Sequence, residues 1–232
     1  LINMPALNNL VAVDWRSGAD RIYCFFKDTD TYSRFNIGGD VPNGYPASTD
    51  GRWDTFTPHI QNLRFGFTTT SLGFNTRSDE DIAWLFFYYG DTPAVCKYDQ
   101  DTDKVSGIYA LADTLWKPIL PYFDKIIAGT WTEVSGHPFL FKFILNDGHY
   151  LSFNYKAKTL TRNAFGQNRL GALAPYKDRI ITAAQNDRTF ADSYWYIFLT
   201  HNQYLVYNIQ ADKLASGPHT INESNWPGLL RN

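Results

Sequence analysis

The stretch YSRFN at residues 32–36 has three near copies further along the chain. These copies are VCKYD at 95–99, YLSFN at 150–154 and YLVYN at 204–208. Each copy places an aromatic residue before Asn or Asp, and the four aromatic residues are Phe35, Tyr98, Phe153 and Tyr207. The intervals between them are 63, 55 and 54 residues. Periods of this length are typical of repeat folds, in which one unit cannot bury its apolar surface alone.

A second apolar run precedes each copy. The four runs are RIYCFFK at 21–27, AWLFFYY at 83–89, PFLFKFI at 138–144 and YWYIFLT at 194–200. Turn-forming residues such as DTDT and NDG separate each run from the copy that follows it. Two runs rich in aromatic and β-branched residues, joined by a short polar turn, predict a β-hairpin.

A third element of small and apolar residues lies upstream of each hairpin. The four elements are AVDWRS at 12–17, SLGFNT at 71–76, AGTWTE at 128–133 and TAAQND at 182–187. Small residues suit the start of a strand where several backbones converge on an axis. A looser segment follows each hairpin, and residues 110–117 have the spacing of a short helix.

Each unit therefore predicts three strands, a weak fourth strand and a helical turn. Four such sheets stacked around an axis give an all-β, four-bladed propeller with short helical turns between the blades. We expect one domain, 1–232, with blades at about 8–66, 67–123, 124–177 and 178–232. A two-sheet sandwich is the main alternative, but a fourfold period does not require one.

The composition excludes several classes of function. Lys and Arg number 21 against 23 Asp and Glu, and no basic block occurs, so we expect no nucleic-acid partner. No run of 18 apolar residues is present, so we expect no membrane span. Two cysteines, Cys24 and Cys96, are too few for a disulfide scaffold. We expect buried free thiols, which favour a soluble cytoplasmic or storage protein over a secreted one.

The first repeat resembles a known family. RIYCFFKDTDTYSRFN followed by VPNGYPASTDGRW is similar to a hemopexin-like repeat, and WPGLL at 226–230 is similar to the end of such a domain. The residues that carry the resemblance are Tyr23, Phe25, Tyr32, Phe35, Gly44, Tyr45, Pro46 and Trp53. Among single-domain members of the family, the chain most resembles the seed albumins and lectins of legumes.

The resemblance implies an ion in the central channel, bound by main-chain carbonyls at the start of each inner strand. The matching positions are Ala12, Ser71, Ala128 and Thr182. The family usually has an acidic residue there, and none of these four is acidic. Since Ca²⁺ favours charged oxygen ligands, their absence favours a sodium ion, a chloride ion or water over calcium.

The sequence contains no recognisable catalytic motif, so we expect a binding protein and not an enzyme. The resemblance implies haem or a polyamine as ligand. His149 and His201 lie in equivalent predicted turns of the third and fourth repeats, where two imidazoles could ligate haem iron or another metal. The alternative is that both are exposed turn residues. A haem site between two propellers would require a homodimer or another chain.

Carbohydrate binding is the alternative function, because sugars stack on aromatic rings beside polar side chains. The candidate contacts in predicted loops are Asn43, Asp50, Arg52, Trp53, Trp116 and Trp226. The alternative role of each Trp is to pack a helical turn against a blade.

Overall fold

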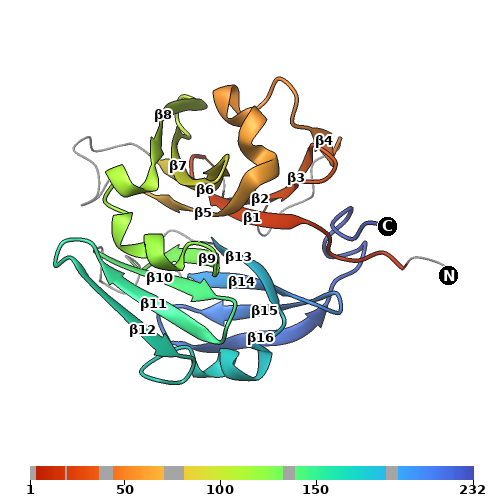
Figure 1. The fold of residues 1–232 in the computed structure, drawn as a ribbon. Coiled ribbons are helices and arrows are strands. Elements are labelled where there is room, and N and C mark those ends of the chain that lie inside the picture. The colour runs from red at the N-terminus through yellow and green to blue at the C-terminus, as the bar shows by residue number, and fades with distance from the viewer. Residues whose placement is uncertain (1–3, 19, 37–43, 71–80, 133–138, 187–192) are drawn as a thin grey trace.

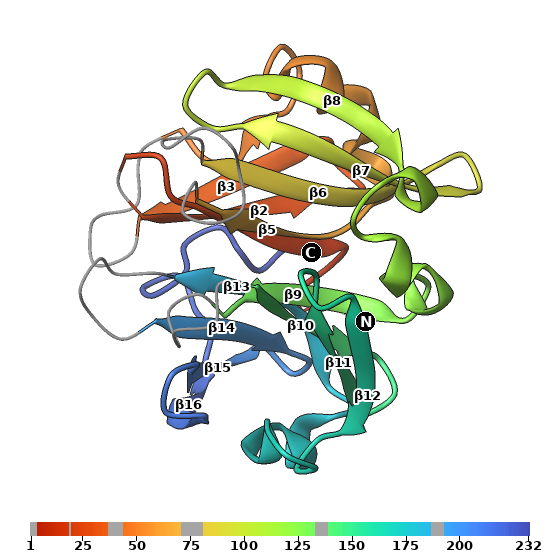
Figure 2. The same cartoon turned by 90° about the vertical axis from the view of Figure 1, so that its left-hand side faces the viewer.

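A computed structural model describes the chain except for residues 1–3, 19, 37–43, 71–80, 133–138 and 187–192. The described residues form four antiparallel sheets of four strands, arranged as blades in a ring (Figures 1 and 2). Each sheet uses strands that are consecutive in the sequence, in simple up-and-down order. The predicted all-β, four-bladed propeller is confirmed.

The strands are distributed four to a blade. Blade 1 comprises β1 (Leu10–Trp15), β2 (Arg21–Phe26), β3 (Thr31–Asn36) and β4 (Ala47–Ser48). Blade 2 comprises β5 (Leu63–Thr69), β6 (Ile82–Tyr89), β7 (Thr92–Asp99) and β8 (Lys104–Ala110). Blade 3 comprises β9 (Ile126–Trp131), β10 (Leu140–Leu145), β11 (His149–Asn154) and β12 (Thr159–Ala164). Blade 4 comprises β13 (Ile180–Asn186), β14 (Tyr194–Leu199), β15 (Gln203–Asn208) and β16 (Lys213–Thr220).

Short 3₁₀ helices connect the blades. Those in the described residues that bear on the sites are η1 (Asp54–Asn62), η2 (Leu111–Asp113), η3 (Lys117–Tyr122) and η5 (Gly171–Tyr176). Pro58, Pro121 and Pro175 lie inside three of them, and proline removes a backbone donor, which keeps such helices short.

The inner strand of blade 2 differs from the prediction. It is β5, which begins at Leu63, whereas the blade was expected to begin near residue 67 and its inner strand at 71–76. In β5, the buried Phe65 and Phe67 lie on either side of Gly66 in the sequence. This pattern is typical of a strand that is covered on both faces, here by the two neighbouring blades. Residues 71–76 lie outside the described residues.

Small residues do occupy equivalent positions in the four inner strands. In each blade, one inner-strand residue lies at the level of the repeated aromatic. The residues two positions before it are Ala12, Gly66, Gly129 and Ala183. A methyl group on Gly66 would lie 2.9 Å from the carbonyl oxygen of Trp84. Glycine is therefore required there, because the neighbouring strand approaches closely.

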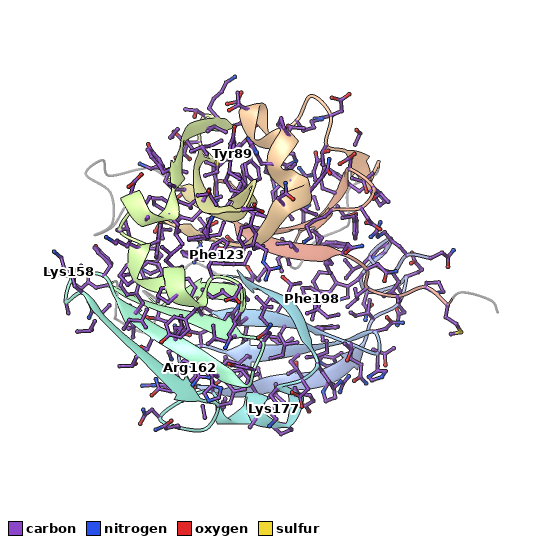
Figure 3. All side chains as sticks on the ribbon, viewed as in Figure 1. Tyr89, Phe123, Lys158, Arg162, Lys177 and Phe198 are labelled. Atoms are coloured by element: carbon purple, nitrogen blue, oxygen red, sulfur yellow. The ribbon has the colours of Figure 1, made fainter. Side chains whose placement is uncertain are left out.

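Four apolar cores hold the ring together, one at each junction between neighbouring blades. The repeated aromatic residues Phe35, Tyr98, Phe153 and Tyr207 are between 0 and 3% exposed, and each packs toward the preceding blade. Figure 3 shows Phe123 and Phe198 in the interior of the ring, with Lys158 and Lys177 at its edge.

The two ends of the chain meet where blade 4 joins blade 1 (Figure 1). Ala6 pairs with Arg231 through two backbone hydrogen bonds of 2.8 and 2.9 Å. The guanidinium of Arg231 also binds Asp28 at 2.7 Å and lies over the ring of Phe26, 4.2 Å from its centroid. These contacts close the ring.

Cys24 and Cys96 are both buried and free, as predicted. They lie in different blades, and burial raises the pKa of both thiols, that of Cys96 to about 12. Both thiols are therefore neutral at physiological pH and unreactive in the folded protein. Among the described residues, no helix is long and apolar enough to cross a membrane.

Candidate ligand sites between the blades

A cavity of about 430 Å³ opens between blades 1 and 2. We call it the aromatic pocket. Five of its lining residues are aromatic: Trp15, Tyr23, Tyr32, Tyr45 and Trp53. The remaining lining residues are Arg34, Gly51, Arg52, Asp54, Asp103 and Lys104. Its volume is within the range of about 300–1,000 Å³ that is typical of small-molecule sites.

Trp53 forms the centre of the pocket wall. Gly51 (φ 68°) and Trp53 (φ 55°) adopt left-handed backbone conformations, after which the chain enters η1. This turn directs the indole inward, where its centroid lies 4.9 Å from that of Tyr23 and 5.4 Å from that of Tyr32. Both contacts are edge-to-face, the geometry that aromatic quadrupoles favour.

Tyr32 and Tyr45 are two of the three tyrosines that line the pocket. Their rings are 5.5 Å apart, and the guanidinium of Arg34 lies 5.6 Å from the centroid of Tyr45. Burial, with the neighbouring Tyr45 adding to it, raises the pKa of Tyr32 to about 12. Its phenol is therefore neutral at physiological pH and can both donate and accept a hydrogen bond.

Two carboxylates join the pocket to blade 2. Asp54, at the start of η1, accepts a hydrogen bond of 2.9 Å from the backbone N–H of Val105. Asp103, in the turn between β7 and β8, accepts a hydrogen bond of 2.5 Å from the hydroxyl of Tyr98. The pocket thus combines three basic and two acidic side chains with its aromatic wall.

A second cavity, of about 240 Å³, lies at the junction of blades 3 and 4. We call it the basic pocket. Its lining residues are Thr132, Leu140, Lys142, Tyr150, Ser152, Thr161, Asn163, Asn168, Arg169 and Ile209.

The two pockets occupy equivalent places in the propeller. Strand pairing places Tyr23 opposite Arg34 and Lys142 opposite Ser152, each one residue after the partner of the repeated aromatic. By the same count Tyr150 is equivalent to Tyr32. The basic pocket therefore occupies the same backbone positions in blade 3 as the aromatic pocket does in blade 1, with different side chains.

The turns and acids of the two pockets also correspond. Asn168 (φ 70°) and Leu170 (φ 60°) adopt the left-handed conformations of Gly51 and Trp53, which places Arg169 in the position of Arg52. Asp212 accepts a hydrogen bond from the Tyr207 hydroxyl, as Asp103 does from Tyr98. In both cases the acid lies five residues after the repeated aromatic.

The other two junctions are filled by tryptophan. Trp116 is fully buried between blades 2 and 3, 4.8 Å from Phe141 and 5.4 Å from Phe67 between ring centroids. Trp226 is 5% exposed and packs on Phe35 and Phe198 between blades 4 and 1. Neither of these two predicted sugar contacts lines the aromatic pocket or the basic pocket.

Of the other four predicted sugar contacts, two line the aromatic pocket and two do not line it in the described structure. Arg52 and Trp53 both line the aromatic pocket. Asp50 is exposed in the preceding turn but is not a lining residue, and Asn43 lies outside the described residues. The sequence did not identify the other members of the pocket as ligand contacts: Trp15, Tyr23, Tyr32, Arg34, Tyr45, Gly51, Asp54, Asp103 and Lys104.

A third hollow, of about 540 Å³, lies on the outer part of blade 2. It is lined by the exposed rings of Tyr89 and Tyr109 together with His59, and by small side chains. His59 packs on Phe87 and Tyr89 at ring-centroid distances of 4.9 and 5.1 Å. No charged side chain lines this hollow, so it offers less to orient a polar ligand.

The histidines proposed for haem do not share a contact in the described residues. His149 begins β11, and its Nδ1 lies 3.1 Å from the carboxylate of Asp147. His201 is exposed, with a φ of 62°, in the turn between β14 and β15. Within the described part of the chain, no three His, Cys, Asp or Glu side chains are grouped to hold a metal ion.

The structure describes three of the four residues predicted to supply channel carbonyls, Ala12, Ala128 and Thr182. Ala128 and Thr182 are at the same level of their strands, but Ala12 is one residue out of register with them, and Ser71 lies outside the described residues. The carboxylate of buried Asp14, on β1, is engaged by the backbone N–H of Thr68 at 2.9 Å and by Arg16 at 3.3 Å. These residues do not fit a divalent cation well.

Comparison with known proteins gave no family assignment: no protein-family model matches the chain, and no curated protein matches it. The hemopexin-like resemblance is thus supported only at the level of the four-bladed architecture.

Proposed function

We propose that the chain is a non-enzymatic carbohydrate-binding protein and that the aromatic pocket is its saccharide site. The observation that carries this proposal is the meeting of five aromatic rings with arginine, lysine and aspartate side chains around one cavity of about 430 Å³. This combination favours a ligand that has both an apolar face and a polar rim.

A sugar ring has both features. Its C–H groups form an apolar face that packs against an aromatic ring, while its hydroxyls point outward around the rim. Arg52 and Lys104 supply donors, Asp54 supplies an acceptor, and the neutral phenol of Tyr32 supplies both. A few polar groups around an apolar wall are what fixes the orientation of a small ligand.

Haem and polyamines, the ligands implied by the family resemblance, match the pocket less well. Within the described part of the chain no histidine lines it, so the described lining offers no histidine ligand for haem iron. Aromatic rings attract the ammonium groups of a polyamine. However, the three basic side chains that line the cavity outnumber its two carboxylates, which disfavours such a cation but not a neutral sugar.

The test is a glycan array, followed by titration of the best saccharide into the protein by calorimetry. Arg52→Gln should weaken binding at least tenfold, because Arg52 is exposed and its loss removes ligand contacts without disturbing the core. Asp50→Asn is the matched control, since Asp50 is exposed nearby but outside the lining. The absence of any saccharide ligand, or equal binding by both variants, would contradict the proposal.

A further inference from the structure

The basic pocket is lined by a lysine whose side chain is largely buried. Lys142 lies in the middle of β10 and is 9% exposed, where the equivalent residues of the other blades are Tyr23, Trp84 and Tyr196. A buried ammonium group is unfavourable unless it is paired with an anion. The replacement of an aromatic residue by lysine at this position therefore requires an explanation.

Asp212 is the carboxylate that acts on Lys142, and its oxygens are already engaged. It accepts hydrogen bonds from the Tyr207 hydroxyl and from the backbone N–H of Leu170, the latter at 3.2 Å. Arg169 Nη1 lies 3.7 Å from its second oxygen. One carboxylate thus faces two cations.

The electrostatics of Lys142 agree with this incomplete pairing. Burial lowers the pKa of Lys142, the nearby Arg169 lowers it further, and Asp212 opposes both effects. The remaining polar lining is neutral and contributes hydroxyl and amide groups from Thr132, Tyr150, Ser152, Thr161, Asn163 and Asn168. The cavity therefore has an excess of positive charge and several neutral donors, which together favour an anionic ligand.

We propose that the basic pocket is a second binding site, which takes a small oxyanion: a carboxylate, sulfate or phosphate group. The anion would lie near Lys142 and Arg169 and would complete the pairing of the buried ammonium. At about 240 Å³, the cavity suits such a group and a small part of the molecule that carries it. This proposal is independent of the saccharide site, because the two cavities share no residue.

The test is calorimetric titration of the intact protein with sodium sulfate, sodium phosphate and sodium acetate, at constant ionic strength set with chloride. The wild-type protein should bind at least one of these anions saturably. Lys142→Met and Arg169→Gln should each weaken that binding at least tenfold. Lys117→Gln removes the same charge from an exposed site on η3 and should leave binding unchanged.

Two controls show whether a loss of anion binding comes from the basic pocket itself. Lys142→Met should remain folded, since methionine fills a similar volume without a buried charge, and thermal unfolding checks this. Binding of none of the three anions would overturn the proposal, as would equal binding by wild-type and Lys142→Met. Because Arg52 lies in the other pocket, Arg52→Gln should retain anion binding whether or not the saccharide proposal is correct.

Discussion

The aromatic pocket and the basic pocket share one backbone frame and differ in chemistry. At both pockets the chain turns through two residues in left-handed backbone conformations, one on each side of an arginine. At both, a tyrosine of the next blade donates a hydrogen bond to an aspartate. Trp53 and Tyr23 line the aromatic pocket. In the basic pocket Lys142 takes the position of Tyr23, while Leu170, at the position of Trp53, is buried and is not a lining residue. The difference shows that the fold fixes the place of a site, while a few side chains decide what the site can bind.

The two filled junctions extend this comparison. Their repeated aromatic residues are Phe35 and Phe153, whereas the junctions with pockets have Tyr98 and Tyr207. Phenylalanine has no hydroxyl, and Lys158 follows Phe153 at the position where Asp103 follows Tyr98. Junctions with a pocket and filled junctions therefore alternate around one shared backbone frame.

The largest effect is expected at a filled junction. Phe153→Ala should lower the free energy of unfolding by about 3–5 kcal/mol, because the phenyl ring is 2% exposed in the core between blades 2 and 3. Urea unfolding measures this change. Phe139→Ala is the control, since Phe139 is only half-buried, and it should cost less. A loss below about 1 kcal/mol for Phe153→Ala would contradict the assignment of this residue to the core.

A smaller effect is expected at the junctions with pockets. Tyr98→Phe and Tyr207→Phe should each cost about 2 kcal/mol, since each removes a hydrogen bond to a carboxylate without creating a cavity. The two losses should be similar if the frames are equivalent. A loss at only one site, measured by the same urea unfolding, would break the comparison between the two pockets.

The smallest effect, and of opposite sign, is expected for Lys142. Because burial lowers its pKa in the folded state, the unfolded chain binds more protons between that lowered pKa and the ordinary value of 10.5, so stability rises with pH there. Without added oxyanion, Lys142→Met should therefore be as stable as wild type or about 1 kcal/mol more stable at pH 7. Its advantage should shrink as the pH approaches 10.5, as followed by unfolding at several pH values. An advantage that grows with pH would contradict this account.

The sequence predicted the fold because the repeated aromatic residues carry the register of every blade. The sequence predicted the inner strand of blade 2 at 71–76, because the small residues there resemble those of the other inner strands. The inner strand is β5, whose sequence has Phe65 and Phe67 at alternate positions. The prediction also set Ala12 one residue out of register with Ala128, because composition alone does not determine strand pairing.

The site was only partly predictable. Arg52 and Trp53 were identified, but Tyr23 and Tyr45 were interpreted as marks of the repeat and not as a pocket wall. Asp103 comes from the next blade, and only the packed structure places it beside Trp53. One signal was present and missed: Lys142 is a charged residue inside an otherwise apolar run.

The most direct test of the account is a crossed binding experiment on Arg52→Gln and Arg169→Gln, which change equivalent residues of the two pockets. Each variant is titrated with the array-selected saccharide and with the oxyanion that the wild-type protein binds. The account predicts that Arg52→Gln loses only saccharide binding and that Arg169→Gln loses only oxyanion binding. Loss of both ligands in either variant, or of neither ligand in both, would contradict two sites of different chemistry on one frame.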